Sequence, residues 1–490
     1  MGLGFGSLEI ARTGMYVNER GLNVTGHNLA NVNTPSYVRQ QATICDSRYM
    51  NIGGGFQVGL GASVEQIRQI RYQYLDDMYR KENATLGYWE ARNRTFEEIE
   101  AIIGEPMEDG LQSVLNKFWD SWQELSKDPS SLTVRALVKQ RAEALIYKMN
   151  HLDSQLSKLQ DDLNTKIFEC IDEINSIGEQ LVELNQIIAK YEVNGEQAND
   201  YRDQRNNLLD RLSYLVNIDV REMQDGQVSV TINGYYLVYG SRHTKLYAEE
   251  KTKGSGLYVP KFEGVDKELK IGDGALKGLM ESRGDALGIL PDKTDTSINL
   301  EGNIISELRQ QLNTLAKFIF NEVNKLHKSG KTMNPEPNNQ GEDFFVLANP
   351  NRPLGMGNIK LNDNLSDLNN IVASQTGDYG DNTIALKIAN IRNEATINVD
   401  AGVVSMDDYY QAIIQEIGNV AGYTKSIYEG QEKLVQSADN FRQSVSGVSM
   451  DEEMTNLMRY KFAYNASART INVIDEMIKT IIERTGLAGR

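Results

Sequence analysis

Few residues in this sequence are spaced so that they could do chemistry together. The four histidines, His27, His151, His243 and His327, are scattered, and none has a second ligand at helical spacing with which to bind a metal ion. We expect each to be a surface or packing residue. The run GGGFQVGLG, Gly53 to Gly61, could cradle a phosphate, but no Gly-Lys-Ser/Thr follows it, so a glycine-rich hairpin is expected. The sequence predicts no metal and no cofactor.

Candidate catalytic groups are equally poorly placed. Paired carboxylates such as Asp76-Asp77 could act as acid and base if they faced each other across a cleft, but they lie next to each other in a helical pattern and suit a solvated face. The two cysteines, Cys45 and Cys170, are too far apart in sequence to indicate a disulfide framework. No pair of nucleophile and base is visible. We therefore predict that the protein is not an enzyme.

Composition narrows the class of protein further. Among 490 residues, 68 are acidic and 51 basic, which gives a formal net charge of −17, and no basic block stands out. A nucleic-acid surface needs clustered lysine and arginine, so nucleic acid is not an expected partner. No run of about 18 apolar residues occurs, and the start lacks the features of a cleaved signal peptide. We expect neither membrane insertion nor export by a cleaved signal.

Both ends of the chain carry a narrow stripe of residues spaced by three and four. The N-terminal stripe is Leu8, Ala11, Met15, Asn18, Leu22, Thr25 and Leu29; the C-terminal one is Met454, Leu457, Lys461, Tyr464, Ala468 and Ile471, continued by Ile474, Ile478 and Ile481. This spacing is typical of a coiled coil, although an ordinary amphipathic helix on its own domain's core is the commoner use of such a pattern. Neither stripe is wide enough to be stable alone. We predict that the two helices pack on each other or on neighbouring copies.

The middle of the chain shows helical and then strand-like patterns. Apolar residues recur with helical spacing from Leu145 to Leu163 and, one residue out of phase, from Ile167 to Ile188, which spans roughly 65 Å at 1.5 Å per residue and indicates a rod. Cys170 falls on this stripe and is expected to be packed. Alternation then begins near Asn217, with hairpin turns at Asp225-Gly226 and Asn233-Gly234. The segment 331–400 has no assignable pattern.

These patterns define the expected fold class. It is mostly α-helical with a β-rich inserted domain, and the N- and C-terminal helices pack as an axial coiled coil. The expected domains are an axial terminal-helix domain (1–45 with 445–490), a rod-like, mainly α domain (46–216 with 296–444), and an outer β-rich domain (217–295).

The stretch LNVTGHNLANVNTPSYVRQ resembles a segment near the start of bacterial flagellar axial proteins, which include rod, hook and hook-associated proteins. The residues that match the family's turn motif are Ala30, Asn31, Asn33, Thr34, Pro35 and Tyr37. Pro35 disfavours helical geometry at Thr34 and so ends the helix. The family has Gly where Ser36 stands. Either this turn needs no positive φ, or Ser36 is strained.

The C-terminal stretch SVSGVSMDEEMTNLMRYKFAYNASARTINVIDEMIKTII is similar to that of the hook-associated protein 1 family, the first hook–filament junction proteins. The resemblance rests on Ser446, Gly447, Val448, Asp451, Glu452 and Glu453 ahead of a Tyr-x-x-Ala-Tyr-x-Ala helix. NDYRDQRNNLLDRLS and LNTLAKFIFNEVNKLHKSG are similar to interior segments of the same family. A hook or rod protein, or a secreted hydrolase on the same scaffold, are the alternatives.

The resemblance implies a structural protein of the extracellular flagellum, exported by the flagellar secretion apparatus without a cleaved signal. Its implied partners are copies of itself in a ring, the hook protein, the second hook–filament junction protein and a cytoplasmic export chaperone on the exposed C-terminal stripe. We predict that the assembly contacts lie on the large side chains of the terminal stripes: Leu8, Met15, Leu22, Leu29, Met454, Leu457, Tyr464, Ile471, Ile474 and Ile478.

Overall fold

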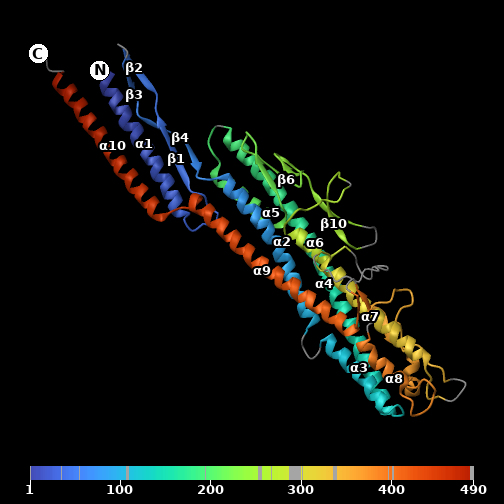
Figure 1. Ribbon diagram of the computed structural model, residues 1–490. Helices are drawn as coiled ribbons and strands as arrows, with labels where there is room; N and C mark the ends of the chain where they lie inside the picture. The colour runs from blue at the N-terminus through green and yellow to red at the C-terminus, as the bar shows by residue number, and fades with distance from the viewer. Residues whose placement is uncertain are drawn as a thin grey trace. The chain divides into compact units, whose positions relative to one another are not determined.

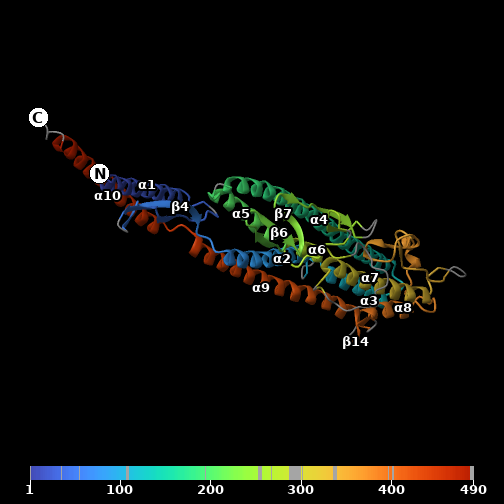
Figure 2. The same cartoon turned by 90° about the horizontal axis from the view of Figure 1, so that it is seen from above.

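The computed structural model describes residues 2–34, 36–53, 56–105, 110–193, 195–251, 256–265, 267–285, 300, 302–334, 339–394, 397–399 and 402–485 (Figures 1 and 2). The chain divides into two compact units. The first comprises Met1–Ala84, Ile174–Lys245 and Glu432–Arg490, and the second comprises Thr85–Glu173 and Leu246–Gln431. Three long helices contribute residues to both units: α2 (Gln73–Ile103), α4 (Leu132–Glu192) and α9 (Met406–Ser446).

The first unit contains both ends of the chain. Helices α1 (Gly2–Ala30) and α10 (Met450–Thr485) pack along each other and lie side by side in both views (Figures 1 and 2). This confirms the prediction that the terminal helices pair. On α1 also lies an antiparallel pair of strands, β1 (Gln40–Asp46) and β4 (Ala62–Gln69). Between them, β2 (Tyr49–Gly53) pairs with β3 (Phe56–Gly59), as the glycine-rich hairpin prediction requires.

The rest of the first unit includes α5 (Asn199–Leu215) and a four-stranded antiparallel sheet. The strands follow one another in the order of the sequence: β5 (Asp219–Glu222), β6 (Val228–Ile232), β7 (Tyr235–Tyr239) and β8 (Arg242–His243). The predicted turns are confirmed. Asn233 and Gly234 both adopt positive φ, 48° and 84°, which is the geometry of a type I′ hairpin.

The second unit is built around a large apolar core. Its remaining helices are α3 (Leu111–Lys127), α6 (Ala275–Arg283), α7 (Ile304–Ser329) and α8 (Thr383–Asn390). Short antiparallel pairs complete it: β9 (Leu246–Glu250) with β10 (Tyr258–Phe262), β11 (Phe345–Leu347) with β12 (Ile359–Leu361), and β13 (Ile397–Val399) with β14 (Gly402–Val404). Four short 3-10 helices are Met356–Asn358, Asp363–Ser366, Leu368–Asn370 and Ile391–Asn393.

The predicted helical stripes are confirmed. Residues from Leu145 to Ile188 lie in the single helix α4, and every residue of the two stripes is buried, Cys170 included. The β-rich region begins as predicted, but the strands of residues 219–262 are divided between the two units, and α6 follows them. The end of the predicted insertion, 286–295, lies outside the described residues. The three-domain division therefore stays a prediction.

The segment 331–400, which had no assignable pattern, is organised by two side chains of α7. Asn324 Oδ1 accepts hydrogen bonds from the backbone N–H groups of Phe344 and Phe345 at 2.9 and 2.8 Å. His327 Nε2 accepts one from the Val372 N–H at 3.0 Å, so its Nδ1 carries the proton and donates to the Glu342 carbonyl at 2.6 Å. His327 is fully buried, and burial lowers its pKa to about 4. It is a packing residue, as expected.

Candidate assembly interface

The seam between α1 and α10 is built on residues that recur every seven positions. On α1 these are Gly14, Gly21 and Asn28, and on α10 their partners are Ser467, Tyr460 and Glu453. The pairs run in opposite directions along the two helices, so the pairing is antiparallel. A constant seven-residue step on both helices is the repeat of a coiled coil.

Small residues let the two helices approach closely. A Cβ atom built on Gly21 would lie 2.7 Å from ring atoms of Tyr460, and one on Gly14 would lie 3.1 Å from Ser467 Oγ. The first distance is shorter than van der Waals contact allows. A side chain at position 21 would therefore force the ring of Tyr460 to shift.

Asn28 lies at the end of this seam and is only 1 % exposed. Its Oδ1 accepts hydrogen bonds from the Tyr37 hydroxyl at 2.8 Å and from the Gln40 N–H at 2.9 Å. Its Nδ2 donates to the Gln40 carbonyl at 2.9 Å and to Glu453 Oε2 at 3.0 Å. Both polar atoms of the side chain are thus paired twice, which is the full capacity of an amide. One residue fixes the exit of the chain from α1, the start of β1 and the position of α10.

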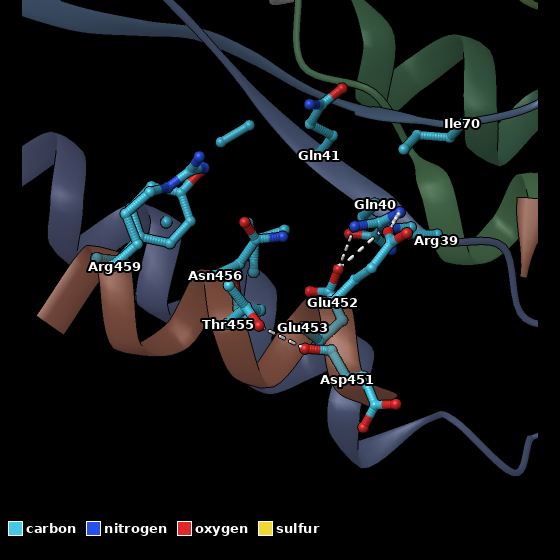
Figure 3. Close-up of a pocket in the computed structure, with 15 residues that line it drawn as sticks. Arg39, Gln40, Gln41, Ile70, Asp451, Glu452, Glu453, Thr455, Asn456 and Arg459 are labelled. Atoms are coloured by element: carbon cyan, nitrogen blue, oxygen red, sulfur yellow. Dashed lines mark hydrogen bonds and ion pairs between the residues drawn. The ribbon is translucent and has the colours of Figure 1, made fainter. Parts of the chain in front are cut away.

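The start of α10 is also held by Arg39. Its guanidinium contacts Glu453 Oε1 at 2.7 Å and Glu452 Oε2 at 2.6 Å, and Glu453 is almost fully buried. These side chains line a cavity of about 530 Å³ between α1, β1 and α10 (Figure 3). Because Glu453 is paired with both Arg39 and Asn28, its buried charge is compensated. Glu452 and Glu453 were identified from the sequence only as family residues, without this role.

The family turn motif begins where α1 ends, at Ala30. Asn31 Nδ2 donates to the His27 carbonyl at 3.0 Å, and the Thr34 hydroxyl donates to Asn31 Oδ1 at 3.1 Å. Asn33 is exposed, and Pro35 lies outside the described residues. Tyr37 is half-buried against the ring of His27, and burial beside several carboxylates raises its pKa.

The backbone of Ser36 has φ +62°. The sequence left two alternatives, a turn that needs no positive φ and a strained Ser36. The positive φ excludes the first of them. Ser36 adopts the left-handed region, which is costly for a residue with a Cβ atom.

The structure places the predicted interface residues at several depths. Four of them on α1 are half-buried: Leu8, Met15, Leu22 and Leu29. Gly14, Gly21 and Asn28 belong to a seven-residue repeat, and each of these four residues lies one position after a member of that repeat. On α10, Ile474 is buried and Met454 is exposed, while the others are half-buried: Leu457, Tyr464, Ile471 and Ile478. The role of these ten residues in assembly stays a prediction.

The sequence reading missed the residues that form the seam within the chain. Hydrophobic periodicity selects large apolar side chains, whereas Gly14, Gly21 and Asn28 contribute small size and hydrogen bonds. The signal that could have found them is their own seven-residue spacing.

The outer side of α10 exposes a row of large apolar side chains. Met450, Met454, Met458 and Phe462 follow one another at four-residue steps and are between 45 and 67 % exposed. Val473, Met477 and Ile481 extend the exposed apolar surface toward the end of the helix. We call Met450, Met454, Met458 and Phe462 the outer stripe. A contiguous exposed apolar surface of this kind marks a site of interaction.

The part of the chain that the structure describes holds no group of three or more His, Cys, Asp or Glu side chains able to bind a metal ion. Across those same residues, no helix is long and apolar enough to cross a bilayer.

The C-terminal residues 442–484, which include all but the last residue of α10, match the family model "Flagellar basal body rod FlgEFG protein C-terminal". Together with the antiparallel pairing of the two terminal helices, this match defines the class of protein, an axial structural protein of the bacterial flagellum. Residues 96–345, about half of the chain, match "Flagellar hook-associated protein FlgK helical domain". The chain belongs to the flagellar hook-associated protein 1 (FlgK) family.

Full-length relatives support this assignment. The chain is 31 % identical to the flagellar hook-associated protein 1 of Bacillus subtilis, with 99 % of both chains covered. It is 22 % identical to that of Escherichia coli, over 96 % of this chain and 98 % of the relative. The fold is similar to that of the flagellar hook junction protein FlgK from Burkholderia pseudomallei, with a TM-score of 0.63, 14 % identity, and coverage of 76 % of this chain and 100 % of that one.

Family membership settles the functional class. The protein is a structural component of the extracellular flagellum at the hook–filament junction and is not an enzyme. The match to the FlgK helical domain favours a hook-associated protein over the hook and rod proteins that share the C-terminal segment.

Proposed function

We propose that this chain works as one subunit of a ring that joins the hook to the filament, and that its terminal helices make the joint. Its proposed neighbours are copies of itself, the hook protein on one side and the second junction protein on the other. Before export, a cytoplasmic chaperone covers the C-terminal stripe. The role is mechanical: helices on adjacent subunits pack against each other and transmit force.

The observation that carries this proposal is the outer stripe. The inner side of α10 is occupied by α1, whereas Met450, Met454, Met458 and Phe462 face solvent in the single chain. Burial of large apolar side chains stabilises an interface by about 25 cal/mol per Å² of area removed from water. The flexible side chain of methionine can fit several different partner surfaces, which suits a helix that binds a chaperone first and the axial structure later.

The half-buried residues predicted from the sequence extend the proposed interface. Leu8, Met15, Leu22 and Leu29 are each accessible in part along α1. A neighbouring subunit could therefore contact both helices at once. In the same proposal, the domains remain those expected from the sequence: an axial pair of terminal helices, a mainly α rod and an outer β-rich domain.

The test introduces a charge into the outer stripe. A strain that lacks its own copy is complemented with the wild type, with Phe462→Asp or with the matched control Phe462→Leu, which keeps an apolar side chain. We expect Phe462→Asp to give hooks without filaments, with the variant absent from purified hook tips, whereas Phe462→Leu restores filaments.

Two further measurements separate the steps. Protein in the culture medium reports export, and the melting transition of the purified monomer reports folding. Because Phe462 faces solvent in the single chain, we expect the melting transition of Phe462→Asp to be unchanged. Normal filaments with Phe462→Asp would contradict the proposed interface.

A further inference from the structure

A second cavity in the first unit is lined by positive charge. Its volume is about 430 Å³, and it lies between β4, the start of α2, α5 and the strands β5 and β6. Five arginines but only two carboxylates line it: Arg68, Arg71, Arg80, Arg202 and Arg205 against Asp76 and Glu222. The whole protein carries a net charge of −17, so this concentration of arginine contrasts with the rest of the chain.

Three of these arginines are held by carboxylates at distances between 2.5 and 2.9 Å: Arg71 by Asp76, Arg80 by Asp210, and Arg202 by Glu192 and Glu222. Such pairs compensate both charges and fix the guanidinium groups in place. These three side chains therefore form a rigid wall with little charge left over.

Arg205 is different. It is only 2 % exposed, and its Nη1 donates to the carbonyl of Gly226 at 2.6 Å. Its Nε is buried without a hydrogen-bond partner, and among the described residues no carboxylate lies within ion-pair distance of it. Burial, with the nearby charge of Arg202, lowers the pKa of Arg205 to about 10, so it is still charged at neutral pH. The nearby carboxylates Glu222 and Glu192, which raise the pKa of Arg205 in part, are themselves paired with Arg202. A buried charge without a direct ion pair of its own is unfavourable.

The position of Gly226 is fixed by the same cluster. Its φ is +79°, and a Cβ atom there would collide with the carboxylate of Glu192, which pairs with Arg202. The turn between β5 and β6 thus holds its carbonyl group against Arg205. Arg68, which also lines the cavity, is exposed and forms no ion pair within the described residues.

We propose that this cavity binds a tetrahedral oxyanion, phosphate or sulfate, between the buried Arg205 and the exposed Arg68. Two guanidinium groups without carboxylate partners supply the charge, and their planar N–H groups match the oxygens of such an anion. The side-chain amide of Asn206, which also lines the cavity and whose Oδ1 accepts from Arg80, provides a further donor through its Nδ2. The bound anion compensates the charge of Arg205 and ties β4, α5 and the β5–β6 turn together.

Titration calorimetry of the full chain with inorganic phosphate tests the proposal, with sulfate as a second arm and chloride at matched ionic strength as the reference. We expect saturable binding of one phosphate or sulfate per chain and none of chloride. Phosphate and sulfate also stabilise many proteins without a site, because they are excluded from protein surfaces. Saturation and the response of variants distinguish binding from that general effect.

Three variants locate the site. Arg205→Met removes the buried charge and should abolish binding, and Arg68→Gln should weaken it by about tenfold, the effect of one lost charge-assisted contact. Arg211→Gln is the control, because Arg211 lies on the same helix but does not line the cavity and stacks over Tyr214. If Arg205→Met does not fold, the comparison of anion affinity between Arg68→Gln and Arg211→Gln still tests the site. No saturable binding by the wild type, or equal binding by Arg68→Gln and Arg211→Gln, would overturn the proposal.

Discussion

Asn28 and Glu453 are 425 residues apart in sequence, and the amide Nδ2 of the first donates a hydrogen bond to Oε2 of the second at 3.0 Å. The same asparagine binds both backbone groups of Gln40. A buried polar contact between two helices fixes their register, because any shift leaves buried polar groups without partners. Asn28 therefore defines how the two ends of the chain align.

The first prediction concerns this residue. Asn28→Ala leaves the Gln40 backbone and one oxygen of Glu453 without their partner, so we expect it to destabilise the pairing of α1 and α10 by roughly 3 kcal/mol. Hydrogen exchange of the α10 amides measures this. Asn33→Ala, at an exposed position of the same turn, is the control and should change stability by less than about 0.5 kcal/mol. Equal effects of the two substitutions would show that Asn28 is not the residue that sets the register.

The second prediction uses two glycines of α1. Gly21→Ala places a methyl group against the ring of Tyr460, so we expect the α1–α10 pairing to lose about 1–3 kcal/mol. Gly26→Ala meets no atom within 4 Å and should stabilise α1 by up to about 1 kcal/mol through helix propensity. Hydrogen exchange in α10 and the melting transition of both variants give the comparison. The two substitutions are expected to change stability in opposite directions. No loss of stability in Gly21→Ala would contradict the close approach of Tyr460 to Gly21.

The third prediction follows from the φ of Ser36. Because glycine adopts positive φ without a Cβ penalty, Ser36→Gly should stabilise the folded protein by about 1 kcal/mol. Ser47→Gly is the matched control at a position whose φ is not positive, and there the added freedom of the unfolded chain should destabilise by about 0.5–1 kcal/mol. Chemical denaturation of the three proteins measures both effects. A destabilising Ser36→Gly would rule out relief of strain.

The fourth prediction concerns pH. The pKa of His327 is lowered to about 4 in the folded protein, against about 6.5 in an unfolded chain. Its contribution to stability is therefore complete above pH 6.5 and is lost as the pH falls toward 4, because the unfolded state then binds the proton more tightly. The total loss is roughly 3 kcal/mol at 1.36 kcal/mol per pKa unit. Denaturation of the wild type and His327→Gln between pH 4 and 7 should show a shallower pH dependence in the variant.

Hydrophobic periodicity predicted the long helices well, because their apolar faces are buried. The two stripes between Leu145 and Ile188 are buried throughout, and the pairing of the terminal helices follows from the narrowness of their stripes. The Asn233-Gly234 pair correctly predicted a hairpin turn, and both residues adopt the positive φ that such a turn needs.

What the sequence did not reveal depends on contacts between distant segments. Helix α10 packs closely on α1 at Gly14 and Gly21, because these two residues have no side chain to keep the helices apart. The folds of residues 341–372 are held by Asn324 and His327, which lie in a helix earlier in the chain. A local sequence pattern cannot predict such contacts, because neither of the two residues in a contact differs from what its own helix or loop would commonly contain.

The pairing of α1 with α10 has a consequence for the order of folding. A contact between residues 425 positions apart closes nearly the whole chain into one loop. The entropy of closing such a loop must be overcome before the contact gives any stability, and contacts of high sequence separation form slowly. The seam between α1 and α10 can therefore close only in a chain that has both ends in place, and it is expected to form later than the local helices and hairpins.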